Sequence, residues 1–302
     1  MSSHQPDRNE SSPVHGLRAD SEHFKRNRRQ TLRILTLTAT TMTGWPGRLL
    51  AATGSPADTC AVIPDETEGP YPGDGSRNFR QHPNALAVSG IERSDIRQSL
   101  KPARGVADGV PLILKLRLID AENACVPLAG HAIYVWHCTR DGNYSMYSPA
   151  IANENYLRGM QVSDAAGEVT FSTIFPGCYD GRWPHIHFEI YRNREIALGT
   201  DFTGDYIKVS QLALPYDICA DVYRRAPGYA SSLSNLERTS LERDMVFGDD
   251  KAEHQMALVS GGIDTGFVAS LTVAIETSAG AIERRKTLSP PPDMPPRPAG
   301  AR

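Results

Sequence analysis

The sequence is poor in the features that mark thiolate metal sites, membrane spans and nucleic-acid binding. Its 302 residues hold five cysteines, and none of them forms the Cys-x-x-Cys pair of a thiolate zinc site. No apolar run is long enough to cross a bilayer as a helix, so we expect no stable membrane insertion. The formal net charge is only −3, and it indicates no nucleic-acid partner. What remains is the composition of an ordinary globular protein.

The N-terminal 56 residues differ from the rest of the chain. A basic stretch at residues 25–29 is followed by the uncharged, weakly apolar residues 34–47. This order, with the pair Arg28 and Arg29, is typical of a twin-arginine-like export signal, and the alternative is a disordered basic tail on a cytoplasmic protein. We assign residues 1–56 to an export signal and linker and expect a periplasmic or extracellular protein. There, some of the five cysteines could form disulfides.

Alternating apolar residues predict β-strands in the body of the chain. The runs that show this most clearly are residues 112–118, 169–175 and 186–191. Gly and Pro separate them at short intervals, and the best helix candidate is residues 215–225. We predict an all-β fold, an antiparallel β-sandwich with few short helices and long loops, over residues 57–280. Residues 281–302 end in a proline-rich segment and are predicted to be a disordered tail.

A His-x-His pair opens one of the predicted strands. Because residues i and i+2 of a strand point to the same face, His185 and His187 can reach one metal ion. Tyr179 ends a Pro-Gly turn six residues before the pair and supplies a third donor within a short segment. The residues that we consider for a fourth ligand are the carboxylates Asp180 and Glu189 and the phenol Tyr144.

An ordered series of motifs resembles the intradiol ring-cleavage dioxygenases, a family that is similar to protocatechuate 3,4-dioxygenase. The series is TEGPYPGDG (67–75), WHC (136–138), DGNY (141–144), QVSDAAGEVTFSTIFPGCY (161–179), GRWPHIHFEI (181–190) and SQL (210–212). The resemblance spans about residues 60–225 and is nearest to the exported, single-domain branch of the family. Several motifs in the right order make it far more specific than any one of them.

The resemblance implies both a site and a reaction. The implied iron(III) ligands are Tyr144, Tyr179, His185 and His187, and the implied active-site neighbours are Arg182 and Gln211. Two phenolates and two imidazoles form a hard ligand set that suits iron(III). The implied substrates are O2 and a catechol-type aromatic diol, which is opened to a cis,cis-muconate-type diacid. Tyr179 is the ligand expected to leave and act as a base.

Other functions remain open at this point. A zinc hydrolase could use the His-x-His pair with Glu189 or Asp180, and a catalytically silent exported sandwich could bind aromatic or polysaccharide material. We expect structural roles for His131 and His137 and a solvated surface for the acidic residues between 240 and 254. The sequence does not choose among protocatechuate, catechol, hydroxyquinol and lignin-derived catechols, and it leaves a homo-oligomer open.

Overall fold

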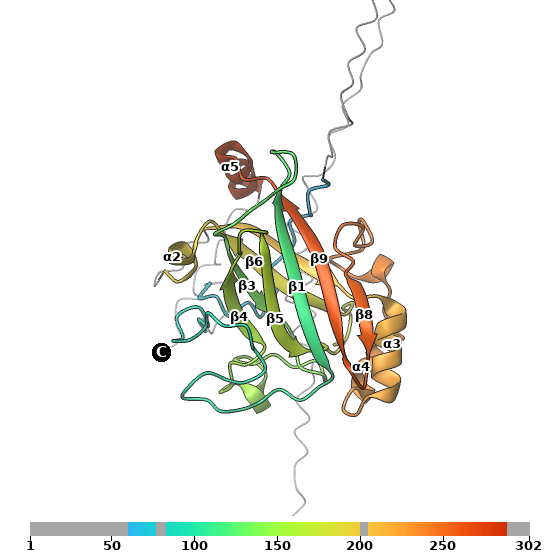
Figure 1. Ribbon diagram of the computed structural model, residues 1–302. Helices are drawn as coiled ribbons and strands as arrows, with labels where there is room; N and C mark the ends of the chain where they lie inside the picture. Colours follow the sequence, from blue (N-terminus) through green and yellow to red (C-terminus); the bar gives the residue numbers. More distant parts are fainter. Residues whose placement is uncertain (1–59, 77–82, 200–204, 289–302) are drawn as a thin grey trace, which may run out of the picture.

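Two β-sheets pack face to face in a computed structural model of the chain (Figure 1). The structure describes residues 60–76, 83–199 and 205–288. The predicted export signal therefore lies outside the described residues. The prediction of an all-β sandwich with few short helices and long loops is confirmed.

The first sheet is built around the long strand β1. Its strands are β1 (Pro111–Asp120), β2 (Val126–Pro127), β5 (Glu168–Ile174), β8 (Leu258–Gly262) and β9 (Gly266–Ile275). β1 pairs antiparallel with β2 and β5 but parallel with β9. The prediction of an antiparallel sandwich is therefore wrong for this one pair of strands. A parallel pair needs a long connection, and β9 reaches β1 only after the chain has passed through the second sheet and the helical segment.

The second sheet carries the strand that opens with the two histidines. Its order is β4 (Arg158–Val162), β3 (Ala132–Trp136), β6 (His185–Tyr191) and β7 (Tyr206–Ala213), and all its neighbours are antiparallel. The β6–β7 pairing places Gln211 directly opposite His187. Two residues that are 24 positions apart in sequence thereby share one face of the sheet.

The core between the sheets follows the predicted alternation. Leu112, Leu114, Leu116 and Leu118 of β1 are buried against Ile133, Val135, Ile186 and Phe188 of the second sheet. The intervening β6 residues, His185 and His187 among them, face the other side of their sheet. All seven residues of β6 are nevertheless buried, because loops cover that outer face as well. The histidines therefore lie in an enclosed place rather than on an open surface.

Short helices complete the fold. They are α2 (Arg194–Ala197), α3 (Tyr216–Arg225), α4 (Ala230–Leu236), α5 (Ala279–Leu288) and the 3-10 turns η1 (Pro149–Ile151) and η2 (Leu241–Arg243). α3 confirms the helix predicted near residues 215–225. Among the described residues, no helix is long and apolar enough to span a membrane.

The predicted tail begins too early. The interval assigned to a disordered tail starts at residue 281, but α5 runs to Leu288. The Ser278 hydroxyl accepts a hydrogen bond from the Ala281 amide, and Ala281 and Ile282 are buried against the body. These contacts stabilise a helix that composition alone does not indicate, because the prolines come only after it. Residues 289–302 lie outside the described residues.

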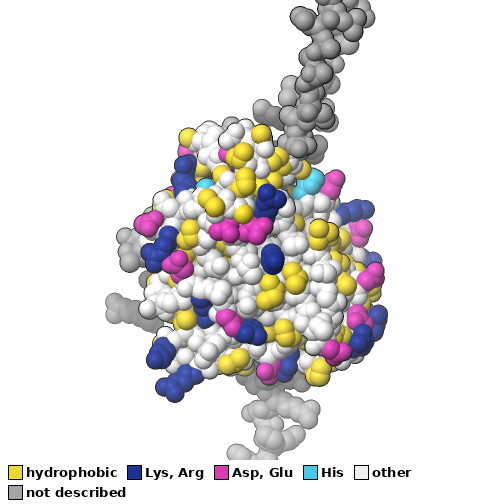
Figure 2. Space-filling view, in the orientation of Figure 1, with side chains coloured by type: hydrophobic (Ala, Val, Ile, Leu, Met, Phe, Trp, Pro, Cys, Tyr) yellow, Lys and Arg dark blue, Asp and Glu magenta, His cyan; other side chains and the backbone are white. Residues whose placement is uncertain are grey.

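A disulfide joins Cys60 to Cys125, which lies in the turn between β1 and β2. It attaches the segment of residues 60–76, which we call the N-terminal strap, to the first sheet. The other cysteines, Cys138, Cys178 and Cys219, are buried thiols. On the face of the molecule shown in Figure 2, acidic and basic side chains are interspersed.

Candidate metal centre

The two imidazoles of the His-x-His pair meet at the start of β6. The Nε2 atoms of His185 and His187 lie 3.0 Å apart, and both side chains are buried. The predicted same-face geometry is therefore present. Strand pleating alone accounts for it, because the two residues are separated by a single position.

The surroundings of each ring determine its protonation. His185 Nδ1 lies 2.5 Å from the Trp183 carbonyl oxygen, which can only accept, so Nδ1 carries the proton and the Nε2 lone pair faces the centre. Burial, with the charge of Arg182 next in weight, lowers the pKa of His185 to about 3. Burial and the neighbouring His185 hold the pKa of His187 well below its ordinary value. Both rings are neutral at physiological pH, the state that binds metal.

Tyr179 brings the first phenol to the imidazoles. It lies in the loop between β5 and β6, and its hydroxyl is 3.3 Å from His185 Nε2. Arg182 Nη1 donates to the same hydroxyl at 3.3 Å. Tyr179 is only half-buried, which distinguishes it from the other phenol at the centre.

Tyr144 supplies the second phenol from the loop after β3. Its ring centroid lies 5.7 Å from that of Tyr179 and 6.4 Å from that of His187. Its hydroxyl is buried and has no hydrogen-bond partner among the described residues. Burial, with the Tyr179 phenol next in weight, raises the pKa of Tyr144 well above 10. A buried, unbonded hydroxyl is costly, and a bound cation would both ionise it and satisfy it. The donor set therefore fits a hard metal ion such as iron(III).

The carboxylates considered as ligands do not join this centre. Glu189 accepts a 2.7 Å hydrogen bond from the Tyr191 hydroxyl further along β6. Asp180 is exposed and pairs with Arg238. Within the described ranges, no three His, Cys, Asp or Glu side chains form a group that could hold a metal ion. Tyrosines are consequently the partners that the fold brings to the histidines.

Arg182 and Gln211 lie together beside the phenol of Tyr179. Arg182 is buried, and its Nη2 donates to Gln211 Oε1 at 2.6 Å. Gln211 in turn donates to the Thr67 carbonyl of the N-terminal strap at 2.9 Å. The structure thus brings together all six residues that the resemblance singled out.

Three more residues lie at the centre. Trp136 stacks on His187, and Tyr71 of the strap packs on Tyr144 with ring centroids 4.8 Å apart. Asp244 is buried against Arg182 at 3.0 Å. The expectation of a solvated acidic surface between 240 and 254 is therefore wrong at Asp244. No local pattern marks this residue, because its partner lies 62 positions away in sequence.

The remaining histidines have structural surroundings. His137 is buried, with Nε2 2.7 Å from Thr173 Oγ1 and Nδ1 2.8 Å from the Cys138 carbonyl. Burial lowers its pKa to about 4. His131 Nδ1 lies 3.2 Å from the Ala129 carbonyl in a turn. These contacts agree with the structural roles expected for both residues.

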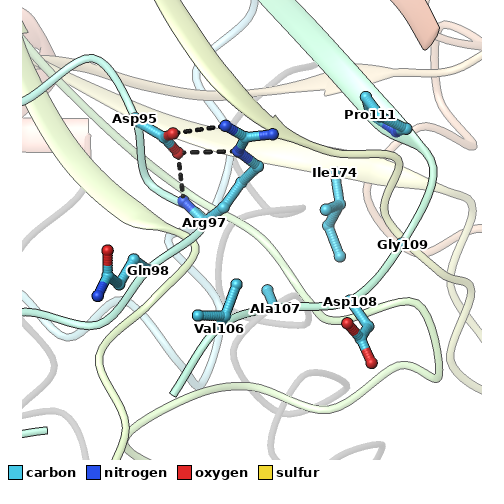
Figure 3. Close-up of a pocket in the computed structure, with 9 residues that line it drawn as sticks. All are labelled: Asp95, Arg97, Gln98, Val106, Ala107, Asp108, Gly109, Pro111 and Ile174. Atoms are coloured by element: carbon cyan, nitrogen blue, oxygen red, sulfur yellow. Dashed lines mark hydrogen bonds and ion pairs between the residues drawn. The ribbon is translucent and has the colours of Figure 1, made fainter. Parts of the chain in front are cut away.

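A hollow of about 280 Å³ lies apart from this centre (Figure 3). Asp95, Arg97, Val106 and Asp108 are among its lining residues. The charge of Arg97 is already paired with Asp95 at 2.6 Å, and Val106 is largely exposed. None of the six site residues borders this hollow.

Comparison with known proteins identifies relatives of the region that holds the centre. A dioxygenase family model matches residues 91–207, which include both tyrosines, both histidines and Arg182. The chlorocatechol 1,2-dioxygenase of Rhodococcus opacus is 44% identical over 59 residues, 20% of this chain and 23% of that protein. The enzyme of the same name from Pseudomonas sp. (strain P51) is 29% identical over 118 residues, 32% of this chain and 46% of that protein. The chain spans less than half the length of each of these curated relatives.

A solved structure extends the likeness to most of the fold. The intradiol ring-cleavage dioxygenase from Tetranychus urticae superposes with a TM-score of 0.53 at 25% identity, covering 72% of this chain and 95% of that one. The sandwich, the motif order and the four converging donors agree with this match. The family model and this structure support the resemblance of the chain to the intradiol ring-cleavage dioxygenases.

Proposed function

We propose that this protein is a non-haem iron(III) intradiol dioxygenase that opens a catechol-type ring with O2 to a cis,cis-muconate-type diacid. The observation that carries the proposal is the convergence of two phenols and two neutral imidazoles around the 3.0 Å gap between His185 and His187. The names of the two curated relatives, both chlorocatechol 1,2-dioxygenases, support a catechol as the substrate class.

The residues that would hold the metal are Tyr144, Tyr179, His185 and His187. Two phenolates add two negative charges, which favours iron(III) over iron(II). When bound, iron(III) would supply Lewis acidity towards the two oxygens of a catechol. The hydrogen bond from His185 Nδ1 to Trp183 and the stacking of His187 on Trp136 would hold the two rings in place for this role.

Tyr179 is suited to take a proton from the substrate. Of the two phenols it is the more exposed, so it can move without opening the core, whereas Tyr144 is fully buried. Arg182 Nη1 lies beside its oxygen at 3.3 Å and would stabilise the phenolate until it accepts that proton. The structural difference between the two tyrosines thus supports distinct roles for them.

Arg182 is suited to stabilise negative charge that develops on the ring. Its guanidinium is buried, where an electrostatic interaction is worth more than in water. Gln211 Oε1 accepts from Arg182 Nη2 at 2.6 Å and holds the guanidinium in place. The guanidinium therefore needs little reorganisation during the reaction. We place the catechol beside Arg182, Tyr179 and Gln211.

A combined optical and oxygen-uptake experiment tests the proposal. Iron-loaded protein should be red-brown from tyrosinate-to-iron(III) charge transfer, and it should consume O2 with at least one of catechol, protocatechuate, hydroxyquinol or a chlorocatechol. Tyr179→Phe should shift or bleach the band. Tyr191→Phe is the matched control, because that phenol is buried on the strand of the two histidines but bonds to Glu189. A colourless protein that holds stoichiometric zinc and works without oxygen would contradict the proposal and support the hydrolase alternative.

We also propose that the protein is exported. The basic pair Arg28 and Arg29 before a weakly apolar stretch motivates this, and the Cys60–Cys125 disulfide supports it because such bonds persist in oxidising compartments. Replacing both arginines with lysine should trap the protein in the cytoplasm. Fractionation with an antibody measures this, and unchanged export of the variant would refute a twin-arginine route.

A further inference from the structure

Asp244 lies at the meeting point of two segments that the sequence keeps far apart. It directly follows η2, and it is one of the few fully buried carboxylates in the described part of the chain. Oδ2 accepts from Arg182 Nε at 3.0 Å and from the Trp183 amide at 2.6 Å. Oδ1 accepts from the amides of Val246 and Phe247 at 2.8 and 3.0 Å. Four donors thus surround one carboxylate.

Each nitrogen of the Arg182 guanidinium has a different hydrogen-bond partner. Nε is held by Asp244, Nη2 by Gln211 and Nη1 by the Tyr179 hydroxyl. The fork geometry of a guanidinium is rigid, so fixing Nε fixes the direction of both terminal nitrogens. The Arg182 group also lies over the Phe247 ring at 6.0 Å, and Asp244 binds the backbone of that residue.

Asp244 also reaches one of the imidazoles through a single residue. It accepts from the Trp183 amide, and the carbonyl of Trp183 accepts from His185 Nδ1. The Trp183 indole is fixed separately by the Leu214 carbonyl at 2.9 Å. Displacing Asp244 therefore disturbs both Arg182 and the carbonyl that orients His185.

We infer that Asp244 is a positioning residue for the reaction: it aims the Arg182 guanidinium at the Tyr179 hydroxyl and holds the carbonyl that orients His185. The inference rests on the proposed function for its effect on turnover, but its geometric part stands on these contacts alone. Burial and the four donors explain why an aspartate is needed here. An uncharged side chain would leave a buried guanidinium without a counter-charge.

Asp244→Asn is the sharpest test. An amide offers one oxygen, so its NH2 group must face two of the four donors. We expect kcat per bound iron to fall about 10- to 100-fold, the usual effect of losing an outer partner of a site, with KM nearly unchanged. We expect the charge-transfer band to shift in Asp244→Asn, and to shift in the same direction in Arg182→Gln. The double variant should be no slower than Arg182→Gln alone, because Asp244 acts through Arg182. Asp244→Glu keeps the negative charge beside Arg182, so it should fold. It takes the place of Asp244→Asn in these measurements if the asparagine variant does not fold.

Asp120→Asn is the matched control. Asp120 is also a buried carboxylate, and it accepts from the Glu122 amide and the Thr277 hydroxyl at 2.9 and 3.2 Å, away from Arg182. This variant should lose stability yet keep kcat and the band. A purely structural role for Asp244 would give the same pattern, with less folded protein but unchanged kcat per bound iron.

A crystal structure of the metal-free Asp244 variant separates this inference from the proposed function. We expect the guanidinium to leave its place between Gln211 and Tyr179. A folded variant that keeps the guanidinium in place, or one with wild-type kcat, would overturn the inference. If the wild type consumed no O2 with any catechol, the proposed function would fail, and the position of Arg182 in the variant would still decide the role of Asp244.

Discussion

The indole of Trp136 stacks on the imidazole of His187 with ring centroids 4.8 Å apart and planes inclined by only 10°. The two residues lie opposite each other on β3 and β6. His187 Nδ1 has no hydrogen-bond partner among the described residues. The stack therefore helps to orient this ring, together with the contact between Nε2 of His187 and Nε2 of His185 at 3.0 Å. The ring of Tyr134 extends the stack on the other side of Trp136 at 5.2 Å.

Trp136→Leu should weaken iron binding about 10- to 100-fold, because it removes the surface that holds His187. Iron competition with a chelator measures the affinity of the folded protein. Phe175→Leu is the control: it trims a buried aromatic residue of the core that contacts Tyr223 and Phe267 but neither histidine. Equal iron affinities in the two variants would show that the stack does not position His187.

Tyr144→Phe should stabilise the metal-free protein and destabilise the iron-loaded one. Without metal the variant removes a buried hydroxyl that has no partner, which should raise the free energy of unfolding by about 1–3 kcal/mol. With iron it removes a ligand. Chemical denaturation of both forms measures the two effects.

Tyr229→Phe is the matched control for this reversal. The Tyr229 hydroxyl donates to the Phe175 carbonyl at 2.8 Å and accepts from the Val110 amide at 3.0 Å. Its loss should therefore destabilise both forms. If Tyr144→Phe destabilised the metal-free protein as much as this control does, the Tyr144 hydroxyl would have a hydrogen-bond partner in the metal-free protein.

Glu66 should make the protein less stable as pH rises. Burial, with Asp249 next in weight, raises the pKa of Glu66 from 4.5 to about 9. The folded protein therefore holds this proton more tightly than the unfolded chain does. The stabilisation is complete below about pH 4.5 and is lost as pH rises through about 9.

Glu66→Gln should remove this part of the pH dependence and leave the protein more stable than the wild type at pH 8. Denaturation midpoints between pH 5 and 9 measure the slope. Asp249→Asn is a useful comparison, because removing the neighbouring charge should lower the pKa of Glu66 and reduce the slope without abolishing it. An unchanged slope in Glu66→Gln would rule out an uncharged Glu66 at neutral pH.

Cys60→Ser should lower stability more than activity. The disulfide closes a loop with a sequence separation of 65 residues, and such bonds typically contribute about 2–4 kcal/mol. Tyr71, further along the strap, is held separately, because Arg158 Nη2 donates to its carbonyl at 2.9 Å. The thermal midpoint should fall while kcat at low temperature stays close to that of the wild type.

The double variant Cys60→Ser/Cys125→Ser checks that the loss comes from the bond itself. It should be no less stable than either single variant, because each one already breaks the disulfide. Additive losses would indicate that the two cysteines contribute separately. A large fall in kcat would instead show that the whole strap depends on this attachment.

Much of the site could be predicted because its central features are local. Strand alternation placed His185 and His187 on one face, and a short turn kept Tyr179 within reach of them. The same alternation in β1 predicted which leucines are buried. Tyr144 could be chosen over Asp180 and Glu189 only from the resemblance, since it lies 41 positions from His185 and no local rule connects them.

The sequence by itself determined the strand character, the facing histidines and the nearby phenol, because these depend on backbone periodicity over a few residues. Only the tertiary structure decided that β9 pairs parallel with β1, that Gln211 lies opposite His187, and that Asp244 is buried against Arg182. Each of these depends on packing between segments far apart in the chain. Burial of a charge becomes favourable only once its partner has been brought to it, and composition carries no record of that partner.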